Sequence, residues 1–251
     1  SGYSAGSHVI VSGSITAAQA NSLNSVDATY IKATIDSSSA TNLAGIATNN
    51  SSRTAANQFT VTVNDTSASA ATLKSVAAMS LAADFSTIDS ITASSAADIK
   101  AVYADTSTTF ATDVLIAVND STLTAADLKA INALSSDKVT STATTLSGTV
   151  ADLGTVLAVA STKIGRAADI AVTVTDTVAD AADLVALDDD GDITNGRTTG
   201  RYTTGRFTLS SGTSLIGSRA EVLFILGAKY ALADGTTPAR FTNIKDVNVT
   251  L

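Results

Sequence analysis

Acidic residues alternate in one short stretch of the chain. Asp188, Asp190 and Asp192 stand at every second position, and Asn195 follows three residues later. Carboxylate and amide oxygens are the ligands that Ca²⁺ prefers, so this spacing predicts a calcium site. The stretch departs from the EF-hand loop, because its glycine is fourth rather than sixth and Thr199 stands at the twelfth position in place of Glu. The alternative interpretation is a solvated acidic turn that ends a helix.

A second set of aspartates follows apolar segments. Asp65, Asp120 and Asp176 each lie in a turn and recur once per long repeat. They would either line up as an acidic ladder along one edge or accept hydrogen bonds from the backbone of their own turns. Turns favour Asp regardless of any ligand, so the sequence favours the second role.

Residues for catalysis are scarce. The chain has a single histidine, His8, and no cysteine, which excludes Ser-His-Asp, Cys-His and thiolate metal chemistry within one chain. Glu221 is the only glutamate, and we expect it to be solvated. No pair of acidic residues stands apart from the repeats and turns, as a glycosidase would need. We therefore expect no enzymatic activity.

Glycine and arginine alternate in a polar segment between residues 196 and 206. The pairs are Gly196-Arg197, Gly200-Arg201 and Gly205-Arg206. Their spacing matches neither a P-loop nor a dinucleotide-binding fingerprint. The segment instead predicts a loop, or a basic contact for an acidic neighbouring subunit.

A repeated motif predicts the helices that would position these residues. Its strongest copies are Ser69–Val76, Ser95–Val102, Thr124–Ile131 and Asp180–Leu187, and its weaker copies are Thr16–Leu23, Ser39–Ile46 and Thr149–Val156. The first residue, Ser, Thr or Asp, is suited to be the N-cap, and in most copies a polar residue three positions later is suited to a capping box. The apolar residues recur at helical spacing, so each short helix would bury one face.

Apolar segments that precede the motifs predict strands. The clearest are 9–11, 59–63, 115–118 and 170–174, and weaker ones lie at 31–35, 88–91 and 144–146. A strand, a turn and a helix in repetition imply parallel strands with right-handed crossovers.

The spacing of the motifs favours a solenoid. Their first residues are 16, 39, 69, 95, 124, 149 and 180, so pairs of motifs recur every 53 to 56 residues. These half-units are too short for a doubly wound sheet with helices on both faces, and they predict an α/β solenoid of strand, turn and short helix around a parallel sheet. We expect the solenoid to span residues 1–187 and residues 188–251 to form a C-terminal cap or joint, with a helix over 219–233 and an edge strand at 247–251.

Composition excludes other classes of protein. The formal net charge is -8 and only 15% of residues are charged, so phosphate neutralisation, and with it nucleic-acid binding, is not expected. The longest apolar run, 222–228, is too short to cross a bilayer, so we expect no membrane insertion. The chain begins Ser1-Gly2-Tyr3, without Met or a leader, which predicts a mature or excised fragment whose secretion signal lies elsewhere.

The repeat resembles those of very large secreted bacterial surface proteins, including cyanobacterial ones. The resemblance is carried by units such as Ile170–Asp176 followed by Asp180–Leu184, and it covers residues 9–187. Such proteins are grouped with type I secreted adhesins and surface-layer proteins, which implies an extracellular or cell-surface location. The glycine-rich nonapeptide of calcium-binding β-rolls is absent, so calcium is not implied through that motif.

Two functions follow as expectations. The first is an extracellular structural protein that associates with identical subunits into a filament or surface layer, because open strand edges and stacking faces favour head-to-tail contacts. The alternative is an adhesin module whose Ser/Thr-rich face binds carbohydrate or another ordered surface. Calcium at the acidic stretch is the one cofactor that we expect.

Overall fold

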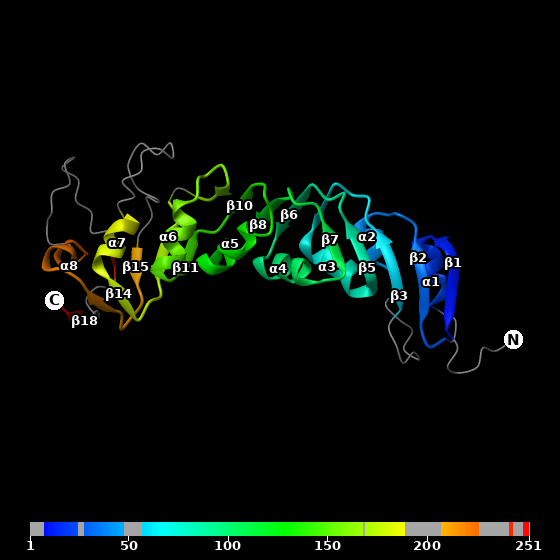
Figure 1. Ribbon diagram of the computed structural model, residues 1–251, viewed down its shortest axis with the longest axis horizontal. Coiled ribbons are helices and arrows are strands. Elements are labelled where there is room, and N and C mark those ends of the chain that lie inside the picture. Colours follow the sequence, from blue (N-terminus) through cyan, green and yellow to red (C-terminus); the bar gives the residue numbers. More distant parts are fainter. Residues whose placement is uncertain are drawn as a thin grey trace. The chain divides into compact units, whose positions relative to one another are not determined.

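The computed structural model describes residues 8–24, 28–47, 57–167, 169–188, 207–225, 241–242 and 248–250 (Figure 1). These residues form an α/β structure with parallel sheets and eight helices. The chain divides into two compact units, residues 1–117 with 134–137 and residues 118–133 with 138–251. The predicted α/β class and the parallel strands are confirmed. The predicted boundary after residue 187 lies inside the second unit, and a cap over 188–251 stays a prediction.

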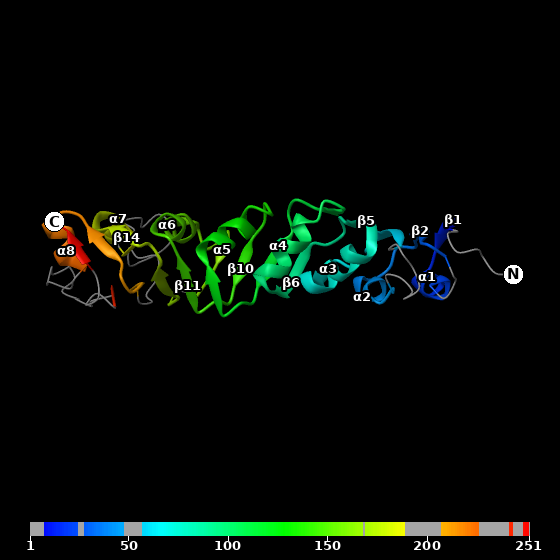
Figure 2. The same cartoon turned by 90° about the horizontal axis from the view of Figure 1, so that it is seen from below.

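The helices follow the repeated motif. In the first unit they are α1 (Ala17–Leu23), α2 (Ala40–Ala44), α3 (Ala70–Met79) and α4 (Ala96–Ala104). In the second they are α5 (Ala125–Asn132), α6 (Val150–Ala158), α7 (Ala181–Asp188) and α8 (Arg219–Ile225), and α5, α6 and α7 follow one another in chain order (Figure 2). From α1 to α6, a Ser or Thr N-cap accepts a hydrogen bond from the backbone N–H three residues later, as the motif predicts.

The first unit contains a five-stranded parallel sheet. Its order is β1 (Val9–Ile15), β2 (Ile31–Ile35), β3 (Gln58–Thr62), β5 (Ser80–Phe85) and β7 (Thr108–Phe110). Short strands of a different sheet follow β3, β5 and β7 in the chain, namely β4 (Ser67–Ser69), β6 (Ser90–Ser94) and β8 (Leu115–Val118). Strands β4 and β6 pair in parallel.

The second unit contains a corresponding sheet. Its order is β9 (Thr122–Thr124), β11 (Thr145–Gly148), β13 (Ala171–Val174), β15 (Phe207–Leu209) and β17 (Phe241–Thr242). A three-stranded parallel sheet holds β14 (Val178–Asp180), β16 (Ser214–Ile216) and β18 (Asn248–Thr250). Strands β10 (Val139–Ser141) and β12 (Ile164–Gly165) also pair in parallel.

The five-stranded sheets that begin with β1 and with β9 share one rule of connection. The first two strands of each sheet lead into helices, β1 and β2 into α1 and α2, and β9 and β11 into α5 and α6. The next three strands of each sheet lead instead into strands of a different sheet. Three strands lie between α4 and α5 and between α6 and α7, whereas two lie between α3 and α4 and between α5 and α6. This difference accounts for the alternation of long and short steps in the sequence.

Strands were under-predicted from the sequence. Segments such as β4 and β9 have only three residues, and they are rich in Ser and Thr rather than apolar residues. The segment 207–225 also carries two strands and a helix, β15, β16 and α8, in the order found at β13, β14 and α7. Helix α8 lies within the helix predicted over 219–233, but this eighth unit was not recognised as a repeat because its helix begins Arg-Ala-Glu rather than Ala-Ala-Asp.

The core is built from equivalent positions of the repeats. The fifth motif residue is fully buried in each of the strong copies and in α2 and α6, as Leu43, Leu73, Ile99, Leu128, Leu153 and Leu184. Apolar strand residues alternate with more exposed ones, so each strand contributes one face to the core. No helix in the described ranges is long and apolar enough to cross a membrane.

Candidate functional site

The acidic stretch lies almost wholly outside the described residues. Asp188 is the last residue of α7, while Asp190, Asp192 and Asn195 fall in the part of the chain for which no placement is given. The Gly-Arg segment at 196–206 lies outside it as well. Within the described ranges, no group of three or more His, Asp or Glu side chains is placed to hold a metal ion. The calcium site stays a prediction.

The turn aspartates bind a neighbouring repeat. Asp65 Oδ2 accepts a hydrogen bond from the Ala40 backbone N–H at 2.6 Å, and Asp176 Oδ2 accepts one from the Val150 N–H at 2.7 Å. Ala40 and Val150 are the first residues of α2 and α6, where unpaired N–H groups and the helix dipole favour a carboxylate. The prediction that these aspartates bind their own turns is wrong for Asp65 and Asp176, because the repeats bring the preceding helix N-terminus within reach.

Small residues lie against the first residues of α3, α5 and α7. Ser94 Oγ accepts a hydrogen bond from the N–H of Ala70, the first residue of α3, at 2.9 Å. The corresponding positions before α6 and α8 are Gly148 and Gly217, and a Cβ atom added at either would lie 2.9 Å from an alanine Cβ atom of the preceding helix. Little space remains at these contacts, so the stacking of repeats requires a small residue there.

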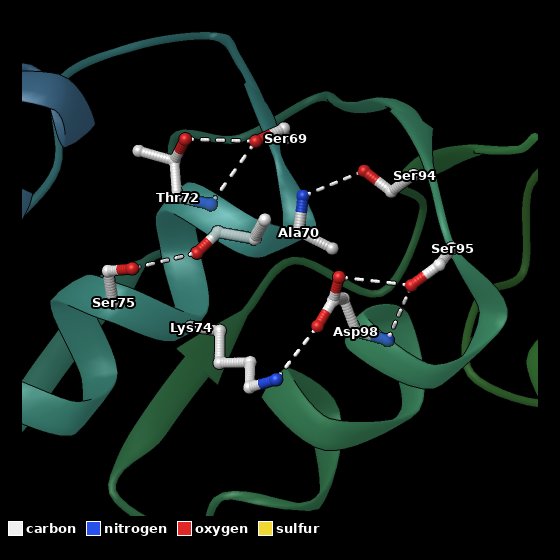
Figure 3. Close-up of polar contacts among 9 residues, drawn as sticks. Ser69, Ala70, Thr72, Lys74, Ser75, Ser94, Ser95 and Asp98 are labelled. Carbon is white, nitrogen blue, oxygen red and sulfur yellow. Dashed lines mark hydrogen bonds and ion pairs between the residues drawn. The ribbon is translucent and has the colours of Figure 1, made fainter.

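Ion pairs join neighbouring helices. Lys74 Nζ lies 2.8 Å from Asp98 Oδ1 between α3 and α4 (Figure 3), and Lys129 Nζ lies 2.8 Å from Asp152 Oδ1 between α5 and α6. The hydrogen bond from Lys74, followed by that from Ser95, lowers the pKa of Asp98 below its ordinary value. The hydrogen bond from Lys129 lowers the pKa of Asp152 in the same way. Both pairs join the sixth residue of one motif to the fourth residue of the next.

This pairing is interrupted between α6 and α7. Gly154 occupies the sixth motif position of α6, and Asp183 occupies the fourth position of α7. A shallow groove of about 380 Å³ lies between these helices, lined by Val150, Ala151, Gly154, Thr155, Asp183, Ala186 and Leu187. The groove has apolar walls and one carboxylate, that of Asp183. In the sequence it is marked by Gly154, which stands where α3 and α5 have a lysine.

Other polar and aromatic groups have structural partners. The Asn57 side chain donates to Asn24 Oδ1 at 2.7 Å and accepts from the Ile31 N–H at 3.0 Å, so this buried amide joins neighbouring repeats. The His8 ring stacks on Tyr30 with ring centroids 4.9 Å apart. These contacts are typical of structural residues rather than of a reactive centre.

Glu221 has a structural role that the sequence analysis missed. Its carboxylate accepts a hydrogen bond from the Ser218 N–H at 2.9 Å, and Ser218 Oγ accepts one from the Glu221 N–H at 3.4 Å. The hydrogen bonds from Ser218 lower the pKa of Glu221. The pair forms a capping box at the start of α8, a role in addition to the solvated carboxylate that the sequence predicts, and the Ser-x-x-Glu spacing is the signal for it.

Strand β1 carries one exposed apolar side chain, Ile10. It stands at the end of its sheet among the described residues. Ile10 on this strand is 67% exposed, the highest value among the large exposed apolar residues of the described chain. An edge strand presents backbone N–H and C=O groups that another strand could pair with.

Comparisons with known proteins return no match to a family model, a curated protein or a solved structure.

Proposed function

We propose that this chain is an extracellular solenoid that associates end to end with identical subunits into a filament or surface layer. The observation that carries the proposal is the edge strand β1 with its exposed Ile10. Parallel pairing with a strand of a second copy would cover the apolar side chain and satisfy edge backbone groups. A contact between two different surfaces propagates if it does not close into a ring, so the product would be a fibre or a layer.

The repeats support the solenoid in this proposal. In each unit the helices are interspersed with parallel strands, neighbouring helices such as α3 and α4 or α5 and α6 pack together, and equivalent motif positions supply the core. Repeat proteins of this kind are stabilised by contacts between adjacent repeats and need protection at their ends. The resemblance to secreted bacterial surface proteins supports the extracellular location.

Negative-stain electron microscopy and light scattering of the purified chain, with calcium and then with chelator, test the proposal. We expect filaments or sheets, and an increase in particle mass with protein concentration. Ile10→Lys should prevent this assembly, because a charge on an edge strand opposes pairing. A monomer over the whole concentration range under both conditions would contradict the proposal, and loss of filaments in chelator alone would support the calcium site at residues 188–195.

Leu81→Lys is the matched control for the edge. Leu81 is also an exposed apolar residue, at 52%, but it lies on β5 inside the same sheet. This substitution should leave assembly unchanged if the strand edge is the contact. If both substitutions abolish assembly equally, subunits associate through the face of the sheet instead.

A second function, adhesion, is favoured by a row of hydroxyl groups. Strand register aligns one hydroxyl residue from each of β9, β11, β13 and β15 in the second unit's five-stranded sheet, namely Thr124, Ser147, Thr173 and Thr208. Parallel strands lie about 4.8 Å apart, so the row has a regular spacing that would suit a repeating ligand such as a polysaccharide. Thr173 alternates with buried Val172 and Val174, which places it on the face away from the core.

Binding to glycan arrays and to insoluble polysaccharides tests adhesion. Thr173→Lys should abolish such binding, because it interrupts the middle of the row. Val178→Lys is the control, since Val178 is exposed but lies on β14, in a different sheet. Absence of binding across a broad array would contradict adhesion and leave assembly as the function.

A further inference from the structure

The groove between α6 and α7 lacks an ion pair that the helix pairs α3–α4 and α5–α6 have. Between α3 and α4, and again between α5 and α6, a lysine of the earlier helix pairs with an aspartate of the later helix. At α6 and α7 the aspartate remains as Asp183, but the lysine position is Gly154. Asp183 is exposed and makes no ion pair with the residues that the structure describes.

Packing does not require this glycine. A Cβ atom at Gly154 would meet only Leu187 Cδ2, at 3.7 Å, which is an ordinary van der Waals contact. Glycine inside a helix also destabilises it relative to alanine. The backbone at Gly154 is that of the surrounding helix, so neither the space nor the conformation accounts for the residue.

The groove has the chemistry that fits a lysine side chain. Val150, Ala186 and Leu187 line it with apolar groups, and Asp183 supplies a negative charge. Lysine buries an aliphatic stem along apolar surface while its ammonium group stays with a charged partner. In the helix pairs α3–α4 and α5–α6, the equivalent position is filled by a lysine whose Nζ lies 2.8 Å from the aspartate.

We propose that this groove binds a lysine side chain presented by a partner polypeptide, with the ammonium group on Asp183 and the stem over Gly154. The incoming lysine would replace the one that the repeat lacks here. The formal net charge of -8 favours the approach of a cationic segment. This proposal does not depend on self-association, and any polypeptide with an accessible lysine meets its requirement.

Amide NMR shifts of the full chain, titrated with N-acetyl-lysinamide, test the proposal. We expect saturable shifts at the amides of Gly154, Asp183 and Leu187, with a dissociation constant in the millimolar range. N-acetyl-norleucinamide, which lacks the ammonium group, should bind at least tenfold more weakly. Butylamine has the ammonium group and the stem but no peptide groups, so it distinguishes a lysine of a polypeptide from a free amine. If butylamine binds as tightly as N-acetyl-lysinamide, the ligand is a free amine and the proposed polypeptide partner is wrong.

Two variants should remove the site, and a third should create an equivalent site elsewhere. Asp183→Asn should weaken binding of N-acetyl-lysinamide at least tenfold, and Gly154→Lys should abolish it by filling the groove with an internal lysine. Lys74→Gly should create an equivalent site at Asp98 between α3 and α4, with saturable shifts there. Circular dichroism checks that each variant is folded. Shifts that do not saturate, or that persist unchanged in Asp183→Asn and Gly154→Lys, would overturn the proposal.

Discussion

At the scale of single residues, two glycines of neighbouring segments have opposite surroundings. Gly148, at the end of β11, faces Ala125, and an added Cβ atom would lie 2.9 Å from the alanine Cβ atom. Gly154, in α6, has only Leu187 Cδ2 near the same point, at 3.7 Å. The first glycine is required by a close approach of two repeats, whereas the second is not.

Alanine at these two positions should therefore change stability in opposite directions. Gly148→Ala should lower the free energy of unfolding by about 1–3 kcal/mol, because an overpacked contact must shift. Gly154→Ala should raise it by up to about 1 kcal/mol, because alanine is the better helix former. Urea denaturation followed by circular dichroism measures both. The same sign for the two variants would contradict the assignment of the close contact to Gly148.

Tyr103 belongs to a small aromatic cluster. Its ring stacks on Phe110 with centroids 4.2 Å apart, and Phe110 contacts Phe85 at 5.1 Å. Burial raises the pKa of Tyr103 to about 12, and its hydroxyl oxygen is buried without a hydrogen-bond partner among the described residues. Folding therefore favours the protonated phenol while providing it with no hydrogen bond.

The pKa of Tyr103 predicts how stability changes in alkali. The phenol titrates near pH 10 in the unfolded chain and near 12 in the folded protein, so its contribution to stability is complete below pH 10 and is lost as the pH rises toward 12. Tyr103→Phe should lose less stability between pH 9 and about 11 than the parent chain does. At pH 7 the variant should be equal to the parent or more stable by up to about 1 kcal/mol, because no hydrogen bond is removed. Urea denaturation at the three pH values measures this, and a clear loss of stability at pH 7 would show that the hydroxyl has a partner.

At the scale of elements, α2 and α6 depend on the next repeat. Helix α2 has only five residues, which is too short to be stable alone, and the side chain that holds its first N–H is Asp65, 25 positions later in the sequence. Asp176 holds α6 in the same way, 26 positions after Val150. The caps of these two helices therefore come partly from the next repeat of the same chain.

Removing the carboxylate of Asp65 should loosen α2. Asp65→Ala should lower the free energy of unfolding by about 1 kcal/mol and speed hydrogen exchange at the Ala40 amide, because that N–H loses its acceptor. Asp89→Ala is the control, since Asp89 is an exposed turn residue with no side-chain hydrogen bond in the described part of the chain. Hydrogen exchange followed by NMR compares the two. Equal exchange at Ala40 in both variants would contradict the capping role.

At the scale of the whole molecule, the chain forms two compact units, each with its own five-stranded sheet. Contacts in a repeat protein are mostly between adjacent repeats, so the effect of a core substitution should remain close to it. Leu73 in the first unit and Leu184 in the second occupy the same motif position and are both fully buried.

A core substitution should therefore lower the stability mainly of the unit that carries it. Leu73→Ala and Leu184→Ala should each cost about 2–5 kcal/mol of local stability, because each leaves a cavity. Hydrogen exchange with mass spectrometry should show lost protection mainly in the unit that carries the substitution. Leu81→Ala, at an exposed position, should leave both units protected. Equal loss of protection throughout the chain would indicate a single cooperative structure.

Much of the fold could be predicted because the helices carry local signals. The hydroxyl N-caps, the polar residue three positions on and the buried fifth residue recur in almost every copy, and the structure places helices there. The short strands β4 and β9 carry no such signal, because backbone pairing with neighbouring repeats defines them rather than apolar side chains. The candidate groove was missed because an absent lysine is visible only beside the pairs formed by Lys74 and Lys129.

The sequence by itself determined the α/β class, the positions of the first seven repeats and the alternation of short and long steps, because caps, turns and apolar spacing act over a few residues. Only the tertiary structure decided which repeat each polar side chain serves. Asp65 and Asp176 cap helices that precede them by about one repeat, and Lys74 and Lys129 pair with the helix that follows. Sequence spacing places such residues in a turn or a helix, but their partners depend on how parallel strands bring distant backbone groups together.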